Sequence, residues 1–129
     1  MPWKVVVVDD DPTVHKLIGR ALPSGEFEVQ SVQNPLQAFD EVKRLQPDLV
    51  ILDLMMPKIT GLEICQKLKE SQETKGIRIL ILSAKESQED RVRGLEIGAD
   101  DYISKPFHLA SLIRKIQYML NEAKGTPTT

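Results

Sequence analysis

The sequence is poor in the residues that build cross-links and soft metal sites: it has one cysteine, Cys65, and two histidines among 129 residues. An internal disulfide is therefore excluded, and no His/Cys cluster has the spacing of zinc ligands. Long hydrophobic runs are also absent, since the longest, such as residues 5–8, fall far short of the ~20 residues that span a bilayer. No signal-peptide pattern precedes the first apolar segment, which favours a cytoplasmic protein without a membrane partner.

An excess of positive charge is missing too, because 17 basic side chains face 19 acidic ones, for a net charge of −2. This balance gives the domain itself no electrostatic reason to bind nucleic acid. The hydrophobic share of 41% and the charged share of 28% are ordinary for a globular domain. We expect one domain over residues 1–123 and a polar tail over 124–129. No output domain follows, so the chain is either a stand-alone protein or one part of a larger one.

Short apolar segments alternate with amphipathic ones along the whole chain. The predicted strands are residues 3–8, 27–31, 49–52, 77–82 and 101–104, and the predicted helices are 12–21, 35–45, 61–71, 88–97 and 109–120. Strictly alternating strands and helices imply right-handed crossovers and a parallel sheet. The continuously apolar strands 1, 3 and 4 belong in its centre, and the half-polar strand 2 belongs at an edge. We therefore predict a doubly wound α/β domain with the strand order 2-1-3-4-5.

Helical spacing also predicts which side chains face the core. The inward stripe of helix 35–45 is expected to be Leu36, Phe39, Val42 and Leu45. In helix 88–97, which Gly98 ends, we expect Val92 and Leu95 to point inward. His15 and His108 lie at or near helix starts without a second His or Cys, so we expect both to be exposed and without a special role.

Polar side chains stand at the carboxyl ends of four predicted strands: Asp9 and Asp10, Asp53, Ser83, and Lys105. In open parallel sheets the ligand crevice lies at this edge, next to the point where the strand order reverses. The predicted topology brings all four strand ends to one crevice. Their joint placement indicates chemistry rather than the turns that each residue could form alone.

Three carboxylates in one crevice repel one another unless they share a cation. Ligands made only of oxygen select a hard ion, so we expect Mg²⁺ or Mn²⁺, held by Asp9, Asp10 and Asp53 and by the backbone carbonyl of Met55. A metal, an ammonium group and a hydroxyl together neutralise a phosphoryl group while a carboxylate attacks phosphorus in line. Asp53, central and alone at its strand end, is the predicted nucleophile.

The chain resembles the receiver domains of bacterial two-component response regulators (CheY-like domains). The resemblance covers residues 3–122 and rests on four motifs in order: Val-Val-Asp-Asp-Asp-Pro at 7–12, Asp-Leu-Met-Met-Pro-Lys-Ile-Thr-Gly at 53–61, Leu-Ser-Ala at 82–84, and Gly-Ala-Asp-Asp-Tyr-Ile-Ser-Lys-Pro-Phe at 98–107. It implies a flavodoxin-like fold. It also implies that Asp53 accepts phosphate from a phosphohistidine on a sensor histidine kinase or a histidine phosphotransfer protein, with no enzymatic activity beyond the domain's own phosphorylation and slow dephosphorylation.

The resemblance further implies roles around Asp53. Ser83 and the Ala84 amide would contact the phosphoryl oxygens, and Lys105, whose bond to Pro106 would be cis, would pair with them. Tyr102 matches the family's switch aromatic, which turns inward when the hydroxyl residue moves toward the phosphate. Met55 and Lys85 flank the phosphate, and we expect them to control the access of water to it.

Residues 89–102 resemble transcription-factor receivers of the OmpR/PhoB type, which form symmetric dimers through salt bridges on helix 4, strand 5 and helix 5. This chain keeps Arg91 and Asp101, and Lys115 is a candidate partner for Asp101. Those receivers usually carry a glutamate opposite the Arg, where this chain has Ser111. We therefore expect either a weak homodimer or a different protein at this surface.

Two other functions compete with this interpretation. Residues 9–13 also fit the Asp-x-Asp-x-Thr pattern of haloacid-dehalogenase phosphatases, with Asp9 as nucleophile and Asp11 as general acid. That alternative gives Asp53 no task and leaves little chain for a cap over a substrate. A flavin-binding module uses the same sheet order, but the acidic loop at residues 9–11 would repel the flavin phosphate.

Overall fold

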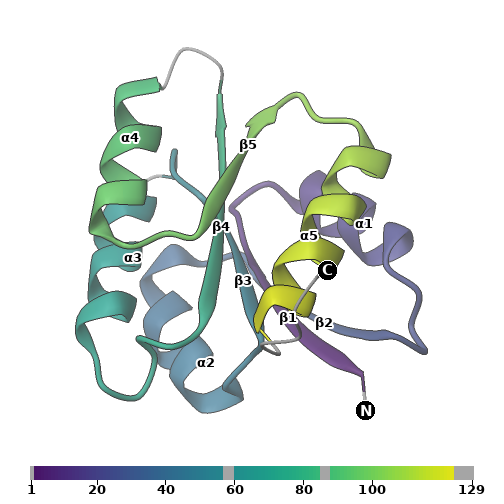
Figure 1. The fold of residues 1–129 in the computed structure, drawn as a ribbon, viewed down its shortest axis with the longest axis horizontal. Coiled ribbons are helices and arrows are strands. Elements are labelled where there is room, and N and C mark those ends of the chain that lie inside the picture. Colours follow the sequence, from purple (N-terminus) through teal and green to yellow (C-terminus); the bar gives the residue numbers. More distant parts are fainter. Residues whose placement is uncertain (1, 57–59, 85–87, 124–129) are drawn as a thin grey trace.

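The computed structural model describes residues 2–56, 60–84 and 88–123 (Figure 1). The elements alternate as predicted: β1 (Trp3–Val8), α1 (Pro12–Ala21), β2 (Phe27–Val32), the 3-10 helix η1 (Pro35–Gln37), α2 (Ala38–Leu45), β3 (Leu49–Asp53), α3 (Gly61–Glu70), β4 (Arg78–Ala84), α4 (Gln88–Ile97), β5 (Asp101–Lys105) and α5 (Leu109–Ala123). Among these described residues, no helix combines the length and apolarity needed to cross a membrane.

The five strands form one parallel sheet in the order β2-β1-β3-β4-β5, which confirms the predicted topology. β4 runs two residues further than predicted and β5 one residue further. The reason is that Ser83 still pairs with Ser104, and Ala84 with Lys105, so the backbone ladder continues to the edge of the sheet. Ser83 and Lys105 are therefore held by strand pairing and not by loops.

Two hydrophobic cores hold the helices against the sheet. One face of the sheet packs against α1 and α5, and the other packs against α2, α3 and α4 (Figure 1). Along β1, Val5 and Val7 point into the first core, whereas Val6 and Val8 point into the second. Because both faces are covered, the central strands are apolar at nearly every position, and only their carboxyl ends are open to carry polar groups.

The prediction for the second helix was wrong at Leu36, whose side chain is 56% exposed. This residue lies in η1, a tighter turn that Asn34 caps, and α2 begins only after it. The change of helical period moves Leu36 off the inward face. Phe39, Val42 and Leu45 pack against the core as predicted, and Ala38 is buried with them.

The inward face of α4 was also predicted wrongly, because Val92 and Leu95 are exposed on its outer side. Gly94 is the buried residue of this helix, and a Cβ at that position would collide with Cδ1 of Ile81. The helix thus approaches the sheet through its glycine, which leaves its two larger aliphatic side chains outside. Gly98, with a φ of 134°, ends the helix as predicted.

Candidate functional site

Two carboxylates lie at the centre of the carboxyl edge of the sheet. Asp9 follows β1 directly and is fully buried, and Asp53 is the last residue of β3 and is also buried. Val8 and Leu52, which precede them, are register partners in neighbouring strands, so the two acidic side chains come from adjacent strand ends. Asp10 follows Asp9 on the surface of the same edge.

Lys105 joins these acids from β5, on the far side of β4. Its Nζ lies 3.0 Å from Oδ2 of Asp9 and 3.5 Å from Oδ2 of Asp53. One carboxylate oxygen from each of Asp9, Asp10 and Asp53 lies within 4.8 Å of the others. Three hard oxygen ligands at this spacing fit a divalent cation such as Mg²⁺.

The local electrostatics oppose the charged form of Asp53. Burial and the neighbouring Asp9 charge raise the pKa of Asp53 from 3.8 to about 6, although Lys105 and the hydrogen bond from the Met55 amide act in the other direction. Burial also disfavours charge on Lys105, but hydrogen bonding to Asp9 and the charges of both carboxylates outweigh it and raise the pKa of Lys105. The site thus gathers negative charge that one ammonium group does not fully neutralise.

The start of α3 packs very close to the backbone of Asp53, and only a glycine, Gly61, fits at this position. The Met55 amide donates a hydrogen bond to Oδ1 of Asp53 over 3.3 Å, and the Gly61 amide donates to the Leu54 carbonyl over 3.0 Å. A Cβ on Gly61 would collide with the backbone of Asp53 and Leu54. Thr60 caps α3 through its side chain, so the helix starts directly beside the acidic site.

Ser83 reaches the same edge from β4, between Asp53 and Lys105 in the strand order. It is fully buried, and among the described residues its Oγ has no hydrogen-bond partner. A buried hydroxyl without a partner is costly unless a ligand uses it, so this atom marks a place for an acceptor oxygen. Ala84 follows it, half-buried, in register with Lys105.

His15 corrects the sequence analysis, whereas His108 is exposed as predicted. The His15 side chain is only 7% exposed, and its Nε2 lies 2.6 Å from the backbone oxygen of Asp9. Helical periodicity places residue 15 on the first turn of α1, but periodicity carries no sign that this turn folds back over the end of β1. The one feature of the sequence that could have indicated the burial of His15 is its position next to Val14, which faces the core.

Tyr102 lies on β5, where its side chain is 37% exposed and lies near two cations. The guanidinium carbon of Arg91 lies 4.9 Å from the centre of its ring, and Nζ of Lys115 lies 6.0 Å from it. Nζ of Lys115 also lies 3.2 Å from Oδ2 of Asp101 within the same chain. Arg91 donates a hydrogen bond to Oγ of Ser104 over 2.7 Å, a contact that sequence reasoning missed.

The remaining predictions concern single residues and one peptide bond near the acidic site. The Lys105–Pro106 bond is cis, as expected from the resemblance. Lys85, expected to flank the phosphate, lies outside the described residues, and Met55 is exposed next to Asp53. Asp11 accepts a hydrogen bond from the Thr13 amide over 2.9 Å and caps α1, so its carboxylate already has a structural partner.

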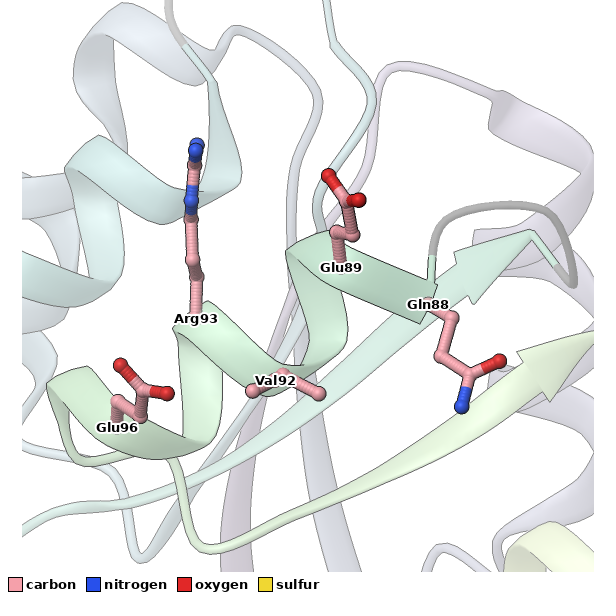
Figure 2. A pocket seen from close by; sticks show the side chains of 5 residues that line it. All are labelled: Gln88, Glu89, Val92, Arg93 and Glu96. Carbon is pink, nitrogen blue, oxygen red and sulfur yellow. The ribbon is translucent and has the colours of Figure 1, made fainter.

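Two hollows on the surface bear on the location of the site. An apolar groove of about 400 Å³ adjoins it between α1 and the segment after β5, lined by Asp11, Thr13, Val14, Leu17, Lys105, Pro106 and Phe107. A larger open hollow of about 700 Å³ lies along α4, lined by Gln88, Glu89, Val92, Arg93 and Glu96, all from that one helix (Figure 2). Asp9, Asp10 and Asp53 line neither of these two hollows, but Lys105 lines the first, which therefore adjoins the site.

Comparison with known proteins agrees with this geometry. The model of the response regulator receiver domain family matches residues 5–117. The response regulator MprA of Mycobacterium sp. (strain KMS) is 39% identical over 120 residues, which cover 93% of this chain and 51% of that protein. The DNA-binding dual master transcriptional regulator RpaA of Synechocystis sp. is 32% identical over 96% of this chain and 52% of that protein. The chain thus spans about half the length of these relatives.

Solved structures show the same fold. The chemotaxis response regulator CheY4 of Vibrio cholerae superposes with a TM-score of 0.84 at 26% identity, over 92% of this chain and 99% of that one. The signal receiver domain of a histidine kinase from Syntrophus aciditrophicus gives 0.85 at 29% identity, over 98% and 96% of the two chains.

Proposed function

This chain belongs to the receiver-domain family of two-component response regulators, and we propose that Asp53 is its phosphoacceptor. The observation that carries the proposal is the position of Asp53 at the sheet edge, with Lys105 at 3.5 Å and the unpartnered Ser83 hydroxyl on the adjoining strand. The donor would be a phosphohistidine on a sensor histidine kinase or a histidine phosphotransfer protein.

In the transfer, an ionised oxygen of Asp53 forms the new bond to phosphorus while the bond from phosphorus to the donor histidine breaks. Lys105 and the Ser83 hydroxyl would then hold the phosphoryl oxygens, together with the Ala84 amide. Asp9, Asp10 and Asp53 would hold Mg²⁺ or Mn²⁺, with the Met55 carbonyl as a further ligand. The metal, when bound, supplies positive charge that offsets the charge of the phosphoryl group.

The hydroxyl of Ser83 provides the first step of a switch. It is buried without a protein partner in the described structure, so a phosphoryl oxygen would be the acceptor that it lacks. Its movement toward Asp53 would open space beside β5, and Tyr102 would turn inward to fill it. The surface formed by α4, β5 and α5 would change with it, which makes these elements the proposed output surface.

The donor protein would approach over the groove between α1 and the segment after β5, because Lys105 lines both this groove and the acidic site. Leu17, an exposed apolar side chain of α1, lines the same groove. An apolar contact here would hold the donor while leaving the phosphohistidine free to reach Asp53.

The output surface would bind either a second copy of the chain, weakly, or a different protein. Asp101 is paired with Lys115 within its own chain, and Arg91 is engaged by Ser104 and Tyr102. With Ser111 in place of the glutamate, a dimer would have to replace contacts of Arg91 that the monomer already makes. This competition supports a weak dimer.

The site opposes the phosphatase alternative, because the Asp11 carboxylate, which would be the general acid, accepts a hydrogen bond from the Thr13 amide and caps α1. Location of the covalent phosphate tests the two functions directly. With Mg²⁺ and a small phosphodonor, mass spectrometry should find the phosphate on Asp53 of the wild type and on no residue of Asp53→Asn. The exposed Asp40→Asn serves as the matched control and should be labelled like the wild type. Phosphate on Asp9, or equal labelling of Asp53→Asn, would contradict the proposal.

A further inference from the structure

His15 is a buried polar side chain that the proposed transfer does not use. It lies on the first turn of α1, next to Val14 and three residues before Ile18, which are buried core residues of the same helix. Instead of packing as an apolar residue, its ring reaches back to β1 and places Nε2 2.6 Å from the carbonyl oxygen of Asp9.

The contact fixes the tautomer of the ring. A backbone carbonyl only accepts hydrogen bonds, so Nε2 must carry the proton and donate it. Nδ1 is buried and has no partner among the described residues. A bare lone pair at Nδ1 is less costly there than an unpaired N–H donor, so the tautomer with its proton on Nε2 fits the surroundings.

The carbonyl that accepts this bond belongs to the peptide that joins Asp9 to Asp10. A peptide unit is planar, so the direction of its oxygen also sets the direction of the following amide and Cα. Asp9 is otherwise held by the Val32 carbonyl, the Asp11 amide and Lys105. Among the described residues no group donates a hydrogen bond to the Asp10 carboxylate, so the backbone alone directs that side chain.

From this geometry we infer that His15 is a positioning residue for the cation site, holding the Asp9–Asp10 peptide so that both carboxylates face Asp53. The inference rests on the proposed function, since it assigns a task toward the same metal. It differs from a packing role in one respect: the donor atom at Nε2, and not the volume of the ring, is what the site requires.

The test compares variants that separate the donor from the volume. His15→Leu keeps an apolar side chain of similar size without a donor, and His15→Gln restores an amide N–H near Nε2. Ile18→Val is the matched control, because Ile18 is fully buried on the same helix and belongs to the apolar core. Calorimetric titration should show Mg²⁺ binding weakened about tenfold in His15→Leu, the usual size of the effect when a group that orients a metal ligand is lost. His15→Gln and Ile18→Val should stay within about twofold of the wild type, because the bond or the site is retained.

A second measurement uses metal-free wild type and does not depend on any variant folding. In nitrogen-15 NMR spectra, His15 should show a proton on Nε2 and none on Nδ1, and the Nε2–H signal should shift during Mg²⁺ titration with the same midpoint as the Asp10 amide. A proton on Nδ1, or a signal that Mg²⁺ leaves unmoved, overturns the inference. So does a folded His15→Leu that binds Mg²⁺ like the wild type, or an equal loss in Ile18→Val. Failure of the wild type itself to bind Mg²⁺ would instead contradict the proposed function.

Discussion

Replacing Asp53 by Asn should make the metal-free protein more stable at neutral pH. The Asp53 carboxylate is buried beside Asp9, and these two causes raise its pKa to about 6. The native state therefore holds a charge that it disfavours, whereas the unfolded chain exposes the same group to water. An amide at this position still accepts the Met55 hydrogen bond through its oxygen but carries no charge.

The size of the effect follows from the two pKa values. A tenfold change in an equilibrium constant corresponds to about 1.4 kcal/mol, so the rise of the Asp53 pKa from 3.8 to about 6 corresponds to at most about 3 kcal/mol. Below pH 3.8 the group is protonated in both states and costs nothing. As the pH rises to about 6 the unfolded state loses its proton first, so the native wild type loses stability over this interval and stays at the lower level above it.

The assay is urea denaturation of wild type and Asp53→Asn in EDTA at pH 4 and pH 7.5. The variant should be more stable by up to about 3 kcal/mol at the higher pH, which for a domain of this size raises Tm by roughly 10 °C. The difference should nearly vanish at the lower pH. Saturating Mg²⁺ should reduce or reverse it, because the metal binds the native wild type and not the unfolded chain.

Two results would refute the reasoning. Equal stability of the two proteins at both pH values would mean that the native site does not disfavour the Asp53 charge. A difference that is independent of pH would mean that Asn changes packing and not electrostatics. The exposed Asp40→Asn controls for a general effect of removing one negative charge, and it should change stability by less than ~0.5 kcal/mol at either pH.

Three further predictions concern the metal, the lifetime of the phosphate and the output surface. Asp10→Ala should weaken Mg²⁺ binding by at least about tenfold, because a charged oxygen ligand is lost, and an unchanged calorimetric titration would exclude Asp10 as a ligand. Met55→Asn should speed loss of phosphate from the labelled protein, since an amide beside Asp53 can orient water and a thioether cannot; an unchanged decay rate would contradict this. Ser111→Glu should strengthen self-association in sedimentation with beryllium fluoride by giving Arg91 an acidic partner. A tight wild-type dimer that Arg91→Ala leaves intact would exclude this surface.

The fold could be predicted from the sequence because its strands differ in kind. Residues 49–52 are apolar at every position, which only a strand covered on both faces allows, and residues 27–31 alternate as an edge strand does. The rule that parallel strands end at a common edge then brought Asp9, Asp53 and Lys105 together without any knowledge of the loops. Both steps depend only on the pattern of apolar residues and on the common direction of the strands, and both can be deduced from the sequence.

The inward faces of the helices were harder to predict, because the spacing of apolar residues does not show how closely a helix packs against the sheet. Gly94 lets α4 come so close to Ile81 that the glycine side becomes the inner one, and Val92 and Leu95 are left outside. In a count of apolar residues a glycine contributes nothing, although here it decides which way the helix faces. Leu36 failed for a related reason, since a 3-10 turn shifted the period before α2 began.

Arg91 shows how a comparison of single positions can miss a compensation elsewhere in the same chain. The absence of a glutamate at position 111 predicts a guanidinium that lacks its partner in a dimer. The structure instead places this guanidinium 2.7 Å from Oγ of Ser104 and over the ring of Tyr102. The monomer therefore stabilises the charge itself, through contacts to the strand that carries the proposed switch residue.

If Tyr102 turns inward on phosphorylation, Arg91 loses its aromatic contact at that moment and becomes available to a partner. The phosphate and the output surface would then be coupled through the release of this intramolecular contact. Its release gives the two states of the switch different interaction energies, which a change at position 111 alone would not do.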